Sequence, residues 1–152
     1  MIKIILSILI LCCIAYLGYG IERYYKIRLA IINEYVDFLR YASREIEFLK
    51  TNIIDLINKY PSKVKQFDLN ISDESSINID SKYLTKEVNQ SISSFFDKLS
   101  TTDYNSRSNL LNHSIEVAEQ YRVVAEKEKI QKGELSRKLC ILAGIGLLIL
   151  SL

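Results

Sequence analysis

The stretch Arg137-Lys-Leu-Cys-Ile-Leu-Ala-Gly-Ile-Gly-Leu-Leu-Ile-Leu-Ser-Leu152 decides the fold. Two cations open it, and no charged side chain follows Lys138. A segment this apolar is stable in a bilayer and not in water. Residues 4–21, near the other end of the sequence, are also uncharged. The sequence therefore predicts a membrane anchor at residues 1–21, a second anchor at residues 139–152, and a middle region held to the bilayer at both ends.

The first uncharged run spans 18 residues, and a helix of that length is about 27 Å long, close to one hydrocarbon core. It is longer than the apolar part of a signal peptide, and Gly18-Tyr-Gly20 is a poor cleavage site. We therefore expect an uncleaved anchor. Basic residues flank both anchors on the side of the middle region: Arg23, Lys26, Arg28, Lys132, Arg137 and Lys138. The positive-inside rule then predicts a multi-pass protein of the cell membrane, with residues 22–138 in the cytoplasm and both termini outside.

The middle region is highly charged but nearly neutral. Of the 20 Lys and Arg residues, all except Lys3 lie within residues 22–138, together with all 18 Asp and Glu residues. Nucleic-acid binding needs a basic excess on one face. The charge pattern therefore argues against a nucleic-acid partner and is typical of a solvated helical surface.

Residues 22–60 predict one long helix that continues the first anchor, because apolar side chains recur at steps of three and four. Pro61 ends this pattern, since the residue before a proline is pushed out of the helical region. Residues 61–80 are polar, acidic and poor in helix formers, which predicts a loop.

Two further helices are predicted at residues 81–99 and 103–134, from apolar stripes of the same period. Their candidate caps are Asp80 or Ser81 for the first and Thr102 or Asp103 for the second. The stripe of the last helix begins at Leu110 or Leu111. We expect no sheet, and the predicted fold class is all-α: an antiparallel helical bundle flanked by N-terminal and C-terminal transmembrane helices. The side chains predicted to be buried between the helices include Phe38, Leu49, Phe95 and Leu110.

The sequence offers little for catalysis, a cofactor or a metal. It has no nucleophile elbow, phosphate-binding glycine loop or zinc-protease motif. Its one histidine, His113, is isolated and is interpreted as structural. The cysteines Cys12, Cys13 and Cys140 all fall in the anchors without C-x-x-C spacing. We therefore expect a non-enzymatic protein without cofactor or metal, whose role is to contact other proteins.

The second anchor has 14 residues, about 21 Å of helix, which is short for a membrane span and favours association. Small residues that would let another helix approach closely are Cys140, Ala143, Gly144 and Gly146, with Cys140 and Gly144 four residues apart. The alternative is that Gly and Ala are simply common in membrane helices. If the packing role holds, the partner is another membrane protein or a second copy of the chain.

Three motifs resemble the stage III sporulation protein AB family. The family pattern L-x-x-L-x-x-E-I-x-[YF] corresponds to Phe38-Leu-Arg-Tyr-Ala-Ser-Arg-Glu-Ile-Glu-Phe48. A turn close to F-G-x-x-L-G-x-S-D corresponds to Phe96-Asp-Lys-Leu-Ser-Thr-Thr-Asp103, with Ser100 in place of a glycine. The Leu-Gly-rich terminal anchor after a basic residue corresponds to residues 137–150. The resemblance follows the chain in order over its whole length, except that residues 61–80 do not align.

The resemblance implies a soluble region similar to the cytoplasmic helical domains of the type II secretion inner-membrane platform protein. It also implies a role in the channel-like complex between mother cell and forespore, next to other membrane proteins and a cytoplasmic secretion-type ATPase, and it transfers no catalytic residue. The candidate partner contacts are residues 61–80 and the charges Arg40, Arg44 and Glu47. The alternative for these charges is that they only keep the protein soluble. The alternative function is a membrane-anchored structural adaptor of the cell envelope or division machinery.

Overall fold

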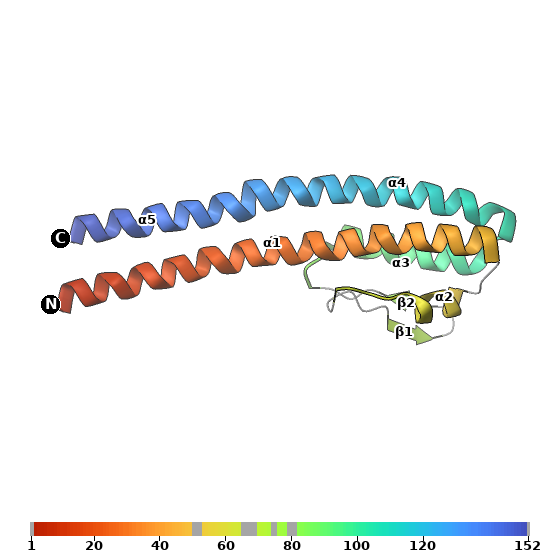
Figure 1. Ribbon diagram of the computed structural model, residues 1–152, viewed down its shortest axis with the longest axis horizontal. Helices are drawn as coiled ribbons and strands as arrows, with labels where there is room; N and C mark the ends of the chain where they lie inside the picture. The colour runs from red at the N-terminus through yellow and green to blue at the C-terminus, as the bar shows by residue number, and fades with distance from the viewer. Residues whose placement is uncertain (1, 50–52, 65–69, 74–75, 79–81, 152) are drawn as a thin grey trace. The chain divides into compact units, whose positions relative to one another are not determined.

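The computed structural model describes residues 2–49, 53–64, 70–73, 76–78 and 82–151 (Figure 1). The elements are α1 (Ile2–Leu49), α2 (Ile53–Lys59), β1 (Asn70–Asp73), β2 (Ser76–Asn78), α3 (Lys86–Thr101), α4 (Tyr104–Glu128), the π-helical segment η1 (Lys129–Glu134) and α5 (Leu135–Ser151). The prediction of a helical fold is confirmed. The expectation of no sheet is wrong at one place: within the segment predicted to be a loop, β1 and β2 form a short antiparallel hairpin in which Ile71 pairs with Ile77.

The chain divides into two compact units. We call residues 1–29 and 124–152 the terminal unit, and residues 30–123 the central unit. Both α1 and α4 contribute to the two units. The two units differ in how their interiors are packed.

The core of the central unit is built from one face of α1 and the apolar face of α3. The side chains of α1 that are almost completely buried are Ile31, Ile32, Tyr35, Val36, Phe38, Leu39, Ala42 and Ile46. Those of α3 are Val88, Ile92, Phe95, Phe96 and Leu99. The ring centroids of Phe38 and Phe96 lie 5.8 Å apart, and those of Tyr35 and Phe95 lie 6.4 Å apart. These contacts hold α3 against α1, and they confirm that Phe38 and Phe95 are buried.

The chain reverses its direction between α1 and α2, so the prediction of one continuous helix over residues 22–60 is wrong. The hydroxyl of Tyr60 donates to the Glu34 carbonyl over 3.4 Å, and the Lys63 backbone N–H donates to the Glu34 carboxylate over 2.9 Å. In a continuous helix Tyr60 would lie about 39 Å from Glu34. The ring of Tyr60 instead packs on Phe38, at 5.2 Å between centroids. Long-range aromatic packing therefore overrides local helical periodicity here.

Two other predicted details change in the structure. The helix expected to begin after Asp80 or Ser81 begins at Lys86, where the Thr85 hydroxyl accepts a hydrogen bond from the Val88 backbone N–H. On α4 the fully buried residue is Leu111, one of the two predicted starts of the stripe, whereas Leu110 is only half-buried, so the prediction that Leu110 is buried is wrong. The side chain of Leu49 lies outside the described part of the structure.

The terminal unit pairs the start of α1 with the end of α4, η1 and α5, which run side by side in opposite directions (Figure 1). Small residues line the close contact between its helices. Ala125 is buried, and an added Cβ at Gly133 would lie 3.4 Å from the Tyr25 Cβ and 3.6 Å from the Glu22 Cα. An added Cβ at Gly18 would lie 2.9 Å from the Cβ of Cys140.

The π-helical segment η1 sets which side chains of the C-terminal helices face α1. Ala125 and Gly133 are eight residues apart, while Gly133 and Cys140 are seven apart. A regular helix returns to the same face after seven residues, so the first interval contains one extra residue. A π-helical turn accommodates one extra residue without breaking the helix. The segment Lys129–Glu134 therefore keeps Ala125, Gly133 and Cys140 towards α1.

Candidate functional site

The outer surface of the terminal unit is apolar. Large hydrophobic side chains that are at least 40% exposed include Leu6, Ile8, Leu9, Ile10, Tyr16, Leu17, Tyr19 and Ile21 on α1, and Leu139, Ile141, Leu142, Ile145, Leu147 and Ile149 on α5. Within the described residues, one helix is long and apolar enough to cross a membrane. This stretch of α1, Ile8–Ile46, contains an 18-residue window with a mean hydropathy of 1.2, of which 11% is buried.

The contact between α1 and α5 contains two of the four small residues singled out from the sequence. Cys140 lies against Gly18, and an added Cβ at Gly144 would lie 3.3 Å from the Leu11 side chain. Ala143 is exposed, and an added Cβ at Gly146 would meet nothing within 4 Å. Gly18 was not singled out from the sequence, because only the structure shows which side of α1 faces α5.

A cluster of ion pairs begins where the apolar surface ends. Glu22 is 3% exposed and pairs with Lys26 at 2.8 Å and with Arg137 at 3.0 Å. The Glu22–Arg137 pair joins α1 to α5, next to the close contact of Gly18 with Cys140. A carboxylate this buried is stable only when cations compensate its charge. The cluster therefore fixes the axial register of α1 relative to α5.

A second set of ion pairs continues the same cluster along the helices. Arg28 on α1 pairs with Glu128 at the end of α4, and Lys132 in η1 pairs with the same carboxylate at 2.8 Å. The hydrogen bond to Glu128, together with its negative charge, raises the pKa of Lys132. Sequence reasoning used Lys26, Arg28, Lys132 and Arg137 only as orientation signals, whereas here they pair with Glu22 and Glu128.

The candidate partner-contact residues Arg40 and Arg44 lie on α1 in the central unit, and both are exposed. Arg40 pairs with Glu119 on α4, which Arg122 also contacts at 2.8 Å. The guanidinium of Arg44 donates to the Arg40 carbonyl over 3.3 Å, and among the described residues it has no acidic partner. Arg40 is therefore used within the fold, while Arg44 has no acidic partner in the part of the chain that the structure describes. The side chain of Glu47 lies outside the described part.

An open groove of about 670 Å³ adjoins the two arginines. Its lining residues are Asp37, Arg40, Tyr41, Ser43, Arg44, Tyr60, Pro61, Lys63 and Ile115. The rings of Tyr41 and Tyr60 lie on its wall with centroids 5.5 Å apart and planes tilted by 50° to each other. Burial raises the pKa of Tyr60 well above its usual value, and the neighbouring carboxylates Glu34 and Asp37 add to the shift. Arg40 is already paired with Glu119 and Asp37 adds a carboxylate, so the groove offers Arg44 and Lys63 as its cations beside two aromatic rings, a combination that fits an acidic protein segment.

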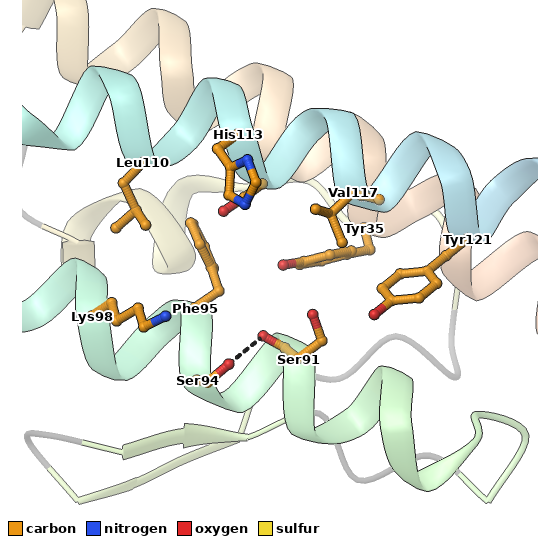
Figure 2. Close-up of a pocket in the computed structure, with 11 residues that line it drawn as sticks. Tyr35, Ser91, Ser94, Phe95, Lys98, Leu110, His113, Val117 and Tyr121 are labelled. Atoms are coloured by element: carbon orange, nitrogen blue, oxygen red, sulfur yellow. Dashed lines mark hydrogen bonds between the residues drawn. The ribbon is translucent and has the colours of Figure 1, made fainter.

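A separate cavity of about 110 Å³ lies between α1, α3 and α4 in the central unit (Figure 2). Its floor contains Tyr35 and Phe95, and His113 lies at its rim on an exposed position. Sequence reasoning missed this cavity. The sequence does contain a signal for it. Tyr35 and Tyr121 place hydroxyl groups in the helical stripes of α1 and α4 that otherwise carry mostly apolar residues.

In the part of the chain that the structure describes, no group of three or more His, Cys, Asp or Glu side chains is arranged so that it could hold a metal ion. Comparison with known proteins gives no match to a family model, to a curated protein or to a solved structure.

Proposed function

We propose that this chain is a non-enzymatic membrane platform protein of a secretion-like complex, whose central unit is a cytoplasmic helical bundle that binds other proteins. The observation that carries the proposal is the terminal unit: two antiparallel helices with an apolar outer surface and a band of ion pairs where that surface ends. The three motifs that resemble the stage III sporulation protein AB family support a more specific role, as a component of the complex between mother cell and forespore.

The lengths of the terminal helices support two membrane crossings. The apolar residues of α1 begin near its start and end at Ile21, and those of α5 run from Leu139 to Ile149. The Glu22–Arg137 ion pair lies next to both of these limits. Charged side chains at the interface and apolar ones beyond it form the pattern that a bilayer requires. The short second crossing is supported laterally by α1 through Gly18, Cys140 and Gly144.

The first test is topology, with single reporter cysteines in a chain whose native cysteines are replaced by alanine. We expect Ser76→Cys in the central unit to resist an impermeant maleimide in intact cells and to react after lysis, because positive flanks hold residues 22–138 in the cytoplasm. We expect Ser151→Cys at the other end of α5 to react in intact cells. Labelling of both positions, or of neither, in intact cells would contradict two crossings with this orientation.

The second test is a complementation assay in an endospore-forming host that carries this gene. Deletion of the gene is expected to abolish sporulation, and the wild-type gene is expected to restore it. Arg44→Glu is expected to reduce complementation strongly. It should also weaken recovery of the cytoplasmic secretion-type ATPase in a pull-down with this protein. The physical reason is that this change places a negative charge in a groove suited to an acidic segment.

The matched control is Lys86→Glu, which also reverses an exposed cation but does not line the groove. Arg40→Glu is unsuitable as the test variant, because it would set two carboxylates against each other at Glu119. Full sporulation with a folded Arg44→Glu protein would exclude the groove as the contact. Normal sporulation after deletion of the gene would exclude the sporulation role and favour the envelope adaptor instead.

A further inference from the structure

The cavity between α1, α3 and α4 differs from an ordinary packing defect in its polar lining. Its floor is apolar and aromatic, with Phe95 and Ala118 almost fully buried. Its walls carry hydroxyl, imidazole and ammonium groups from Ser91, His113 and Lys98. Genuinely empty cavities in proteins are apolar. A polar cavity of this kind is expected to hold a ligand or water.

The Tyr35 hydroxyl is the central feature of this cavity. Tyr35 is 5% exposed, and its ring packs edge-on against Phe95. Figure 2 shows its hydroxyl pointing into the cavity, between the groups that α3 and α4 contribute. Among the described residues, no hydrogen-bond partner is found for this hydroxyl. The hydroxyl oxygen is not one of the fully buried polar atoms that lack a partner, so it faces the open space of the cavity, where a ligand can reach it.

The other polar groups converge on the same space. Tyr121 on α4 and Ser91 on α3 direct their side chains towards the cavity from opposite walls (Figure 2). The Ser94 hydroxyl donates to the Ser91 backbone carbonyl over 3.0 Å, and among the described residues the Ser91 hydroxyl itself has no hydrogen-bond partner. Lys98 is the cation of the lining, and no carboxylate is among the lining residues. The site therefore combines several donors with a positive charge and no competing acid.

We propose that this cavity is a binding site for a compact anion, such as a small carboxylate or inorganic phosphate. The hydroxyls of Tyr35, Tyr121 and Ser91 donate to its oxygens, and Lys98 compensates its charge. Hydrogen bonds to an ionised acceptor are stronger than those between neutral groups. The volume of about 110 Å³ is on the order of seven times that of one bound water, which admits acetate or phosphate and excludes a nucleotide.

The experiment measures binding to the full-length protein in detergent micelles by isothermal titration calorimetry, with acetate, inorganic phosphate and acetamide as probes. We expect saturable binding of at least one of the two anions and none of acetamide, which is the neutral counterpart of acetate. Tyr35→Phe keeps the aromatic packing and removes only the hydroxyl, and it should weaken anion binding by about tenfold or more. The matched control is Tyr16→Phe on the exposed surface of the terminal unit, which should bind as the wild type does.

A second measurement separates a ligand-binding tyrosine from a structural one. Without a probe, the melting temperature of Tyr35→Phe should equal or exceed that of the wild type, because the lost hydroxyl has no partner to stabilise. If Tyr35→Phe does not fold, Tyr121→Phe at the half-buried wall position provides the same binding test. The proposal is overturned if neither anion binds saturably, if acetamide binds as tightly as acetate, if the variants bind as the wild type does, or if Tyr35→Phe melts at a lower temperature.

Discussion

Replacing Phe38 with Ala is expected to lower the free energy of unfolding of the central unit by about 3–5 kcal/mol. Phe38 is 1% exposed and lies where three parts of the chain meet. Its ring contacts Phe96 on α3 and Tyr60 after α2. Truncation would leave a cavity that rigid helices cannot close, and it would remove the packing that holds the reversed segment against α1.

The measurement is a denaturant titration of the full-length protein in detergent micelles, followed by circular dichroism. The matched control is Asn33→Ala, an exposed position on the same helix, which should change the free energy by less than about 0.5 kcal/mol. Equal midpoints for Phe38→Ala and the wild type would mean that Phe38 is not part of the core.

Replacing Gly18 with Leu is expected to separate α1 from α5 in the terminal unit. An added Cβ at this position would already lie 2.9 Å from the Cβ of Cys140 and 3.2 Å from the Cα of Arg137. The second of these is a backbone atom, so the helices must move apart to accept any side chain. Overpacking of this kind costs about 1–3 kcal/mol or more. Separation would also break the Glu22–Arg137 ion pair one turn further along α1.

The readout is the rate at which Cys140 reacts with a maleimide in detergent micelles, in a chain where Cys12 and Cys13 are replaced by alanine. Cys140 is half-buried beside Gly18, so separation of the helices should speed its labelling by about tenfold. Gly20→Ala is the matched control. It lies two residues away, an added Cβ meets nothing within 4 Å, and alanine is the better helix former. Equally slow labelling in Gly18→Leu would show that the two helices do not pack through Gly18.

In the central unit, some of the buried faces can be predicted from the helical periodicity of the sequence, whereas others depend on tertiary packing. The stripe of α3 predicts its buried face correctly, because Val88, Ile92 and Phe95 leave only one apolar side on that helix. On α4, adjacent Leu110 and Leu111 satisfy the stripe almost equally, and only packing selects Leu111 for the interior. The reversal after α1 is also a tertiary effect, since Tyr60 continues the helical stripe in sequence and yet folds back on Phe38.

The candidate site shows the same division. The cations Lys26, Arg28, Lys132 and Arg137 predict orientation from the sequence. Lys26 and Lys132 pair with carboxylates four residues away, whereas the partners of Arg28 and Arg137 are 100 or more residues away and are revealed only by the fold. Among the partner-contact candidates, the ion pair with Glu119 distinguishes Arg40 from Arg44. The cavity around Tyr35 requires groups from α1, α3 and α4 together, so no pattern within one helix could predict it.

The sequence by itself determined that the chain is helical and that its two ends are apolar and uncharged, because composition and helical periodicity are local properties. Only the tertiary structure decided which small residues meet. Gly18 faces Cys140 and Gly144 faces Leu11, while Gly20 and Gly146 have no neighbour within 4 Å of an added Cβ. The physical reason is that a glycine becomes a contact only when a second helix approaches it. That approach depends on the register that the π-helical segment and the Glu22–Arg137 ion pair set between distant parts of the chain.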